Sequence, residues 1–552
     1  IHRYRNHPSL VWWRLVDPLQ DPSPLGLASP NASSSPDLLD VINGEDPTRL
    51  ATWGSGNGRA IACNPHATAR FGLYDLSQAE STALVWENDR GVEMIALAPP
   101  KPGAPLLCGP SARFAALPDL PALVRRYGDR VLPGSDAQVA RDWMSHLESE
   151  LANQGIQRIF ASVSAFCSAT RQPQEYAIRR TIEAHRLNPN RSGFAISDWC
   201  STPMTGNAGM VDIFRSMPWQ RAQAGVCGIA QANAPLTIAL LGLPSHIRAR
   251  DACCVEIWAL NETGPQEGLA LRWEQRTPDG RNISSGRWPV ALGGLGWQER
   301  LGQIDLRAEC GARSHVGSST LYVELSRGER KIASLEERFW VSDLTLPPWP
   351  SDGHILDTAG LLSPLIRTFT AGRRPFRLGA LPERLCLVSW DSGEDLARIL
   401  RQAQEQPSRV ALLLPETGQD RDQTLAIVTS LLPGAHPRLV PLHHNRFGAW
   451  MYGHSHPLLE GVADPGIWDH RQRGLFPRHL IRCLPGDILV GGCAFTMDDE
   501  QAPPQIGAAP PQFGAALSII PWGRGELLFC ALPVVSGCQN HLLSAEQLMH
   551  NM

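Results

Sequence analysis

Acidic and aromatic side chains that follow a predicted strand are the first candidates for chemistry. Glu87 and Asp89 come directly after a strand-like run that ends at Trp86, so two carboxylates stand beside an indole in the sequence. Carboxylates exchange protons, and tryptophan offers a broad apolar face for stacking on a sugar ring. This combination indicates contact with carbohydrate, and the competing interpretation is a pair of surface acids at the start of a loop.

Ser111 is a second candidate, because a hydroxyl becomes a nucleophile when a neighbouring base activates it. The surrounding Gly109-Pro110-Ser111-Ala112 lacks the G-x-S-x-G pattern of a nucleophile elbow, and no histidine lies nearby in the sequence. We therefore interpret Ser111 as a structural residue of a short strand.

The sequence predicts no metal site and no cofactor. Its thirteen cysteines form no C-x-x-C motif, and no metal-ligand spacing surrounds His7 or His66. Scattered buried thiols are the simplest interpretation. The 17 tryptophans against 6 tyrosines favour carbohydrate binding, although large β-rich proteins also bury many tryptophans.

The bulk composition is that of a globular protein. Hydrophobic residues make up 43% and charged residues 19%, and the net charge is -4. Without a basic excess, neither nucleic acid nor an anionic membrane is an expected partner. The longest apolar runs, such as residues 234–243, are too short to span a bilayer.

Residues 1–220 alternate strand-like and helix-like patterns, which predicts a parallel sheet or barrel. We expect strands at residues 10–16, 59–63, 82–86, 92–97, 105–108, 158–165 and 193–197, and helices at residues 36–43, 118–127, 136–153 and 174–187.

The pattern changes twice further along the chain. Residues 221–345 carry β-rich runs separated by turn signals, which predicts an antiparallel β-sandwich of immunoglobulin-like type. After a proline-rich linker, residues 352–545 alternate strands and helices again, which predicts a three-layer, doubly wound α/β domain. The expected fold class is therefore multidomain α/β plus β.

The segment Arg5-Asn6-His7-Pro8-Ser9, with Trp12-Trp13 after it, resembles the fourth barrel strand of family 2 glycoside hydrolases. Segments 46–49, 115–120, 176–186, 193–199 and 209–212 resemble later parts of that barrel in the same order. Residues 255–273 resemble the β-sandwich that follows it, and residues 522–528 resemble the closing strand of the flavodoxin-like or amidotransferase-like module of some β-galactosidases. The resemblance implies that residues 1–220 form the C-terminal part of a (β/α)8 barrel.

The resemblance also implies a retaining mechanism, which needs two carboxyl groups about 5–5.5 Å apart. Pro18 falls at the acid/base position, one residue after Asp17, and Ser111 or Pro110 falls at the nucleophile position. Proline carries no proton, and serine does not replace a carboxylate without a base. Asp17 could act only if the strand end shifts by one residue.

The residues that the resemblance and the strand ends together offer for substrate binding are Asn6, His7, Trp13, Trp86, Glu87, Asp198 and Trp199. The hypothesis that follows is an inactive or strongly divergent carbohydrate-binding relative of the glycosidases. Two alternatives stay open: an active glycosidase that uses the displaced carboxylates Asp17 and Glu87, and a fragment without independent function.

Partner interactions are expected from the same resemblance. Because barrel strands one to three are absent from this sequence, we expect a missing N-terminal region or a partner chain to complete the barrel. The chain begins at Ile1 without a signal peptide, and the cellular compartment stays open. The C-terminal domain has no cysteine at a strand-to-helix elbow, so we expect it to serve packing or homo-oligomerisation.

Overall fold

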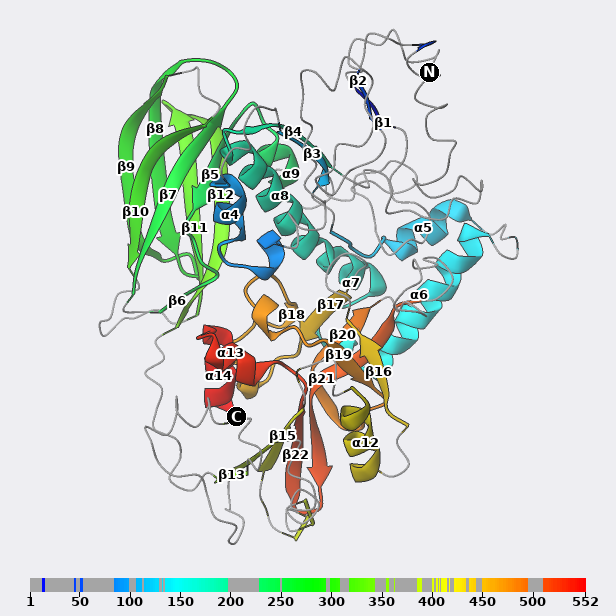
Figure 1. Cartoon of the computed structure of the whole chain (residues 1–552). Helices are drawn as coiled ribbons and strands as arrows, with labels where there is room; N and C mark the ends of the chain where they lie inside the picture. Colours follow the sequence, from blue (N-terminus) through cyan, green and yellow to red (C-terminus); the bar gives the residue numbers. More distant parts are fainter. Residues whose placement is uncertain are drawn as a thin grey trace.

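The computed structural model describes residues 12–14, 44–45, 50–52, 84–98, 106–111, 114–128, 132, 135–196, 228–248, 251–293, 298–307, 317–342, 354–356, 362, 385–389, 400–401, 404–405, 407, 409–414, 416, 421–432, 436–442, 449–494 and 510–552. Within these ranges the chain is a mixed α/β protein with several separate sheets (Figure 1).

Two short parallel sheets belong to the N-terminal part. β1 (Trp12–Arg14) pairs with β2 (Leu50–Thr52), and β3 (Leu106–Ser111) pairs with β4 (Arg191–Ile196). Long helical segments separate β3 from β4 in sequence, as a parallel crossover requires. β1, β3 and β4 overlap the strands predicted at 10–16, 105–108 and 193–197, whereas no strand was predicted at β2. The helix predicted at 36–43 and the strand predicted at 59–63 lie outside the described residues. The two pairs do not by themselves define a barrel.

Between β3 and β4 lie helices of the N-terminal part, some of which begin at capping side chains. They are α5 (Leu120–Tyr127), α6 (Asp136–Asn153), the short η1 (Ile156–Arg158), α7 (Val163–Ala169) and α8 (Arg171–Leu187). The Asp119 carboxylate accepts the amide of Ala122, and the Ser135 hydroxyl accepts the amide of Gln138, which satisfies donors that a helix start leaves open. The predicted helices at 118–127, 136–153 and 174–187 are confirmed.

Three predicted strands are wrong. Residues 84–87 are helical, and residues 92–97 fall on α4 (Gly91–Ala96). Residues 158–165 contain the end of η1 and the start of α7, where the Ser162 hydroxyl accepts the amide of Ala165. The apolar runs in these three segments are too short to show whether their period is that of a strand or of a helix. Helix capping and tertiary packing then determine which secondary structure forms.

Residues 236–342 form two sheets that pack over one core. The three-stranded sheet has the order β10-β7-β5, with β5 (Leu236–Leu241), β7 (Ala252–Asn261) and β10 (Gln298–Arg307). The five-stranded sheet has the order β6-β12-β11-β8-β9, with β6 (His246–Arg248), β8 (Gln266–Arg276), β9 (Asn282–Leu292), β11 (Gly317–Arg327) and β12 (Arg330–Ser342). Alternate side chains such as Leu321, Val323 and Leu325 fill the shared core, because strand side chains alternate between faces.

The C-terminal part is built on a ten-stranded mixed sheet. Its order is β13-β14-β15-β22-β21-β20-β17-β18, and β19 pairs with β21 and with β16 beside this path. These strands are β13 (His354–Leu356), β14 (Leu385–Ser389), β15 (Arg409–Leu413), β16 (Arg438–Pro441), β17 (Ala449–Gly453), β18 (Gly466–Ile467), β19 (His479–Arg482), β20 (Asp487–Ala494), β21 (Gln512–Trp522) and β22 (Gly525–Cys530). Helices α12 (Arg421–Leu431), α13 (Val534–Gln539) and α14 (Leu543–Asn551) pack around it.

Only one end of this sheet is parallel, so the sheet is mixed, whereas the prediction was a doubly wound domain with a mostly parallel sheet. β13, β14, β15 and β22 pair in parallel, whereas β22, β21, β20, β17 and β18 pair antiparallel. The change of direction occurs at the hairpin between β21 and β22, where Gly523 has a φ of 61°. A turn this short joins strands only in antiparallel order.

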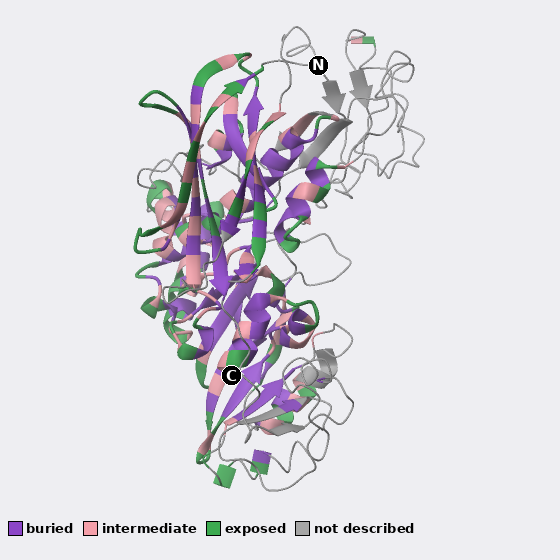
Figure 2. Ribbon diagram, turned by 90° about the vertical axis from the view of Figure 1, so that its left-hand side faces the viewer, coloured by how far each residue is buried: buried purple, intermediate pink, exposed green. Residues whose placement is uncertain are grey.

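Helix α8 lies between the sandwich and the C-terminal sheet (Figure 1). One hydrophobic cluster contains Ile178 and Ile182 of α8, Trp86 and Phe114 from the N-terminal part, and side chains of the C-terminal sheet such as Leu480. Figure 2 shows buried residues continuing between these parts. The parts of the chain therefore share a core, and α8 has few exposed positions because it is packed on several sides.

Candidate functional site

Most of the predicted barrel-mouth residues lie outside the described residues. These are Asn6, His7, Asp17, Asp198 and Trp199. Trp13 lies in β1 and Ser111 ends β3, and for both the structure describes the backbone. The register pairs Ser111 with Ile196, the last residue of β4, so Ser111 stands at the carboxyl end of a parallel pair. Barrel enzymes carry their chemistry at this end of their strands.

Trp86 is enclosed by other aromatic rings rather than open to solvent. It is 2% exposed, and its ring lies 4.8 Å from Phe114 and 6.1 Å from Phe476 between centroids, with Tyr176 at 6.5 Å. Glu87, the next residue, is exposed. Stacking of Trp86 on a sugar would require the ring to leave this aromatic cluster.

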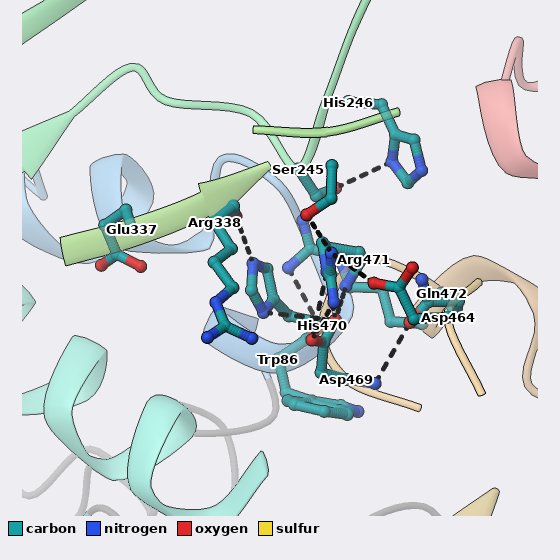
Figure 3. A network of polar contacts seen from close by, with 12 residues as sticks. Trp86, Ser245, His246, Glu337, Arg338, Asp464, Asp469, His470, Arg471 and Gln472 are labelled. Atoms are coloured by element: carbon teal, nitrogen blue, oxygen red, sulfur yellow. Dashed lines mark hydrogen bonds and ion pairs between the residues drawn. The ribbon is translucent and has the colours of Figure 1, made fainter. Parts of the chain in front are cut away.

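Three segments meet at one place, which we call the three-way junction: residues 85–89, the sandwich at Ser245, and the C-terminal part at Arg473. The Asp89 carboxylate accepts hydrogen bonds from the backbone amide of Ser245 (3.1 Å) and from its hydroxyl (2.6 Å). Asp89 also forms an ion pair with Arg473, whose guanidinium donates to the carbonyl oxygens of Val85 and Trp86 at 3.2 Å. Three distant segments of the chain are held together here (Figure 3).

His470 lies at the centre of the three-way junction. Its ring stacks on Tyr176 of α8 with 3.7 Å between centroids and 6° between planes. Its Nε2 lies 3.3 Å from the Arg338 carbonyl oxygen of β12, and its Nδ1 lies 3.7 Å from Asp469 Oδ1. Burial lowers the pKa of His470, so the ring is neutral at pH 7.

Arg471 fixes the same segment on the sandwich. Its Nη2 lies 2.9 Å from Asp469 Oδ2, its Nη1 donates to the Ser318 hydroxyl at 3.2 Å, and its guanidinium lies 5.6 Å from the centre of the Trp340 ring. Burial raises the pKa of Asp469, but the Arg471 charge outweighs it and holds that pKa at about 2. The carboxylate therefore stays ionised at every physiological pH.

A buried ion cluster joins α8 to the sandwich beside the three-way junction. Arg179 lies 2.9 Å from Glu183 and 2.5 Å from Glu337, and Arg180 pairs with Glu183 and donates to the Leu240 carbonyl at 3.0 Å. Burial raises the pKa of Glu337, yet the Arg179 and Arg180 charges hold it below its usual value. Buried charges need such pairing because the desolvation cost is large.

An open pocket of about 590 Å³ lies next to the three-way junction. Its wall combines side chains of the 89–93 stretch, of the sandwich strands β6 and β7, and of the loop between α13 and α14. The polar members are Asp89, Arg90, Glu93, His246, Arg248, Asp251, Cys253, Cys254, Asn540 and His541. Within the described ranges, no three histidine, cysteine or acidic side chains are grouped so that they could hold a metal ion.

The C-terminal thiols do not have the environment of nucleophiles. Burial raises the pKa of Cys530, the last residue of β22, to about 12, so its thiol stays protonated. The start of α13 is occupied by the Glu416 carboxylate, which accepts the amide of Val535 at 2.8 Å. Among the helices that the structure describes, none combines the length and hydropathy that crossing a bilayer requires.

The three-way junction was not predicted from the sequence. The only local signal was the polar run Asp469-His470-Arg471-Gln472, which follows Trp468 between apolar segments. All three of His470, Arg471 and Gln472 are nevertheless buried. Buried polar side chains are informative, but their burial is not visible in a single sequence.

Comparison with known proteins finds only partial similarity. No protein-family model and no curated protein matches the sequence. The solved structures that share parts of the fold include the β-D-mannosidase from Dictyoglomus thermophilum, with 15% identity and a TM-score of 0.35 over 61% of this chain and 39% of that chain. A calcium-binding mutant of β-glucuronidase 2 from Bacteroides uniformis has 10% identity and a TM-score of 0.14 over 35% of this chain and 26% of that chain. This chain thus spans about two fifths of the mannosidase's length.

Proposed function

We propose that this chain is a carbohydrate-binding relative of the family 2 glycoside hydrolases that lacks their retaining machinery. The observation that carries the proposal is the identity of two residues: proline and serine stand at positions 18 and 111, where the resemblance calls for two glutamates. Without a carboxylate at the nucleophile position, no covalent glycosyl-enzyme intermediate can form there.

The register of β3 supports this proposal. Ser111 is paired with the last residue of β4, at the edge where a parallel barrel supplies its nucleophile. Asp198 and Trp199 follow β4 by two and three residues in the sequence. We propose that these two side chains, together with Asn6, His7 and Trp13, contact a sugar without cleaving it.

The surroundings of Trp86 weigh against an enzyme that uses displaced carboxylates. In that alternative Glu87 would act beside the indole of Trp86, which would hold the sugar. The Trp86 ring instead packs against Phe114 and Phe476. Glu87 would then be an exposed acid beside an indole that is already packed against other rings, without the positioning that general acid catalysis needs.

Hydrolysis and binding assays on the same preparation test this function. We expect no turnover of aryl β-mannosides, β-galactosides, β-glucosides, β-glucuronides or β-glucosaminides above that of a heat-denatured sample. We expect calorimetry with the matching oligosaccharides to detect binding that Trp199→Ala weakens at least tenfold.

Two variants test the alternative of an active enzyme that uses displaced carboxylates. Turnover that is abolished by Asp17→Asn or Glu87→Gln, but kept in the exposed control Glu329→Gln, would establish the displaced-carboxylate enzyme and overturn the proposal. Absence of binding to every sugar in the panel would remove the carbohydrate-binding function.

A further inference from the structure

Two histidines lie at the three-way junction, and each has one ring nitrogen without a hydrogen-bond partner among the described residues. They are His246 of β6, through Nε2, and His470, through Nδ1. The other nitrogens are engaged: His246 Nδ1 lies 3.4 Å from the Ser245 hydroxyl, and His470 Nε2 lies 3.3 Å from the Arg338 carbonyl. A carbonyl oxygen only accepts, so the His470 proton is on Nε2 and Nδ1 is bare in the neutral ring.

The groups that face these two rings come from every element of the junction. Around His470 they are Asp469 and Arg471 on its own segment, Tyr176 on α8, Glu337 on β12, and His246 on β6. Behind them, Arg179 and Arg180 of α8 lie near Tyr176, Glu183 pairs with Arg179, and Asp464 pairs with Arg471. Around His246 they are also the pocket residues Asp89, Arg90, Glu93, Arg248, Asp251, Cys253, Cys254 and His541.

The buried charges beside His470 are already balanced. Three guanidinium groups, those of Arg179, Arg180 and Arg471, face three carboxylates, those of Glu183, Glu337 and Asp469. A proton on His470 would therefore add a positive charge without a dedicated counter-ion. It would also create a second N–H donor without a hydrogen-bond partner among the described residues, since Asp469 Oδ1 lies beyond hydrogen-bond distance at 3.7 Å.

We propose that His246 and His470 form an acid-sensitive latch between the sandwich and the C-terminal part. While both rings are neutral, the segment at residues 466–475 stays docked on β12, close to His246 of β6. Proton uptake by the two rings releases this segment and opens the pocket wall to which Asp89 and His246 belong. The latch does not depend on carbohydrate binding.

The direction of the pH dependence follows from the docked environment. Burial lowers the pKa of His470 and lowers that of His246 to about 3, whereas a released ring regains about 6.5. The released state thus binds more protons below pH 6.5, and docking weakens as the pH falls. Each ring contributes a factor of about ten per pH unit in the docking equilibrium until its docked pKa is reached.

The carboxylates of the junction do not respond in the same range. The Arg471 charge overcomes burial and keeps the pKa of Asp469 at about 2, and the pKa of Glu337 is also below its usual value. Their ion pairs persist at pH 5. Between pH 6.5 and pH 5 the latch is therefore expected to open while the ion cluster on α8 stays intact.

Hydrogen exchange measured by mass spectrometry on the full chain tests the latch. Reporter amides are those of Arg471, which donates to Asp469 Oδ1, and Ser245, which donates to the Asp89 carboxylate at the pocket wall. After correction for the intrinsic exchange rate, we expect their protection to fall at least tenfold between pH 6 and pH 5. Peptides from β20 and β21 should keep their protection, because these strands lie in the sheet core.

Four variants separate the latch from other acid effects. The double variant His246→Gln, His470→Gln cannot take up these protons and should lose the pH dependence, and each single variant should reduce its slope. The control His541→Gln, whose side chain is 77% exposed in the same pocket, should behave like the parent.

Three outcomes overturn the proposal: equal reporter protection at pH 6 and pH 5, parallel loss in β20 and β21, or an unchanged pH dependence in the double variant. If the double variant does not fold, the single variants and the parent profile decide by the same criteria.

Discussion

Neutralising Glu337 should destabilise the chain far more than neutralising a surface carboxylate. In Glu337→Gln the side chain keeps its shape, but among the described residues Arg179 and Arg180 are left with Glu183 as their only close carboxylate. One positive charge is then uncompensated among groups that are 7% or less exposed. Removing one partner of a buried ion pair costs about 3–5 kcal/mol.

We expect the lower end of this range, because Arg180 also donates to the Leu240 carbonyl and Gln keeps one acceptor oxygen. The assay is urea unfolding followed by circular dichroism and tryptophan fluorescence, with the slope compared between variants. The matched control is Glu262→Gln, which removes a 2.9 Å pair with Arg186 in which Glu262 is 47% exposed. Its carboxylate is half-exposed, and Arg186 keeps its bonds to the Ala232 and Ala234 carbonyls, so we expect a cost of about 1 kcal/mol.

A second substitution makes this reasoning refutable. Arg179→Met in the Glu337→Gln background restores the charge balance, with Arg180 facing Glu183, so it should recover a large part of the lost stability. The explanation fails if Glu337→Gln costs no more than Glu262→Gln. It also fails if the double variant is as unstable as the single one, because uncompensated charge would then not be the cause.

The remaining predictions concern packing and thiol exposure. Gly491→Ala should lower the free energy of unfolding in urea by about 1–3 kcal/mol, since a Cβ atom there would lie 2.3 Å from the buried Tyr452 hydroxyl. The control Gly293→Ala, with nothing within 4 Å of its Cβ, should change it by no more than about 0.5 kcal/mol. Equal changes in the two variants would contradict this prediction. Timed alkylation with peptide mapping should modify the exposed Cys254 and Cys483 within minutes. It should reach the buried thiols of Cys167, Cys493, Cys530 and Cys538 only on unfolding. Early modification of these buried thiols would show that the core is open.

The regular elements were largely predictable because their pattern is local. The helix at residues 136–153 repeats its apolar positions over five turns and begins at the capping Ser135, so period and boundary agree. The strands of residues 252–342 alternate buried and exposed side chains over ten or more residues. The runs at 82–86 and 92–97 were misassigned because a run of five or six apolar residues is compatible with the period of a strand and with that of a helix.

The orientation of the late strands depended on the turns between them. β20 and β22 lie in residues 352–545, where the sequence predicts alternating strands and helices. Their antiparallel arrangement follows from the two-residue turn at Gly523-Arg524, which the pattern of apolar runs does not describe.

Some properties were fixed by the sequence alone. Pro18 and Ser111 cannot supply carboxyl chemistry in any fold, because a side chain's functional groups do not depend on its surroundings. The three-way junction, by contrast, exists only in the folded chain. It brings Asp89, Ser245, Glu337 and His470 together from segments that are far apart in sequence. Their burial, charge balance and titration arise from that proximity, since electrostatic and desolvation energies depend on distance and enclosure.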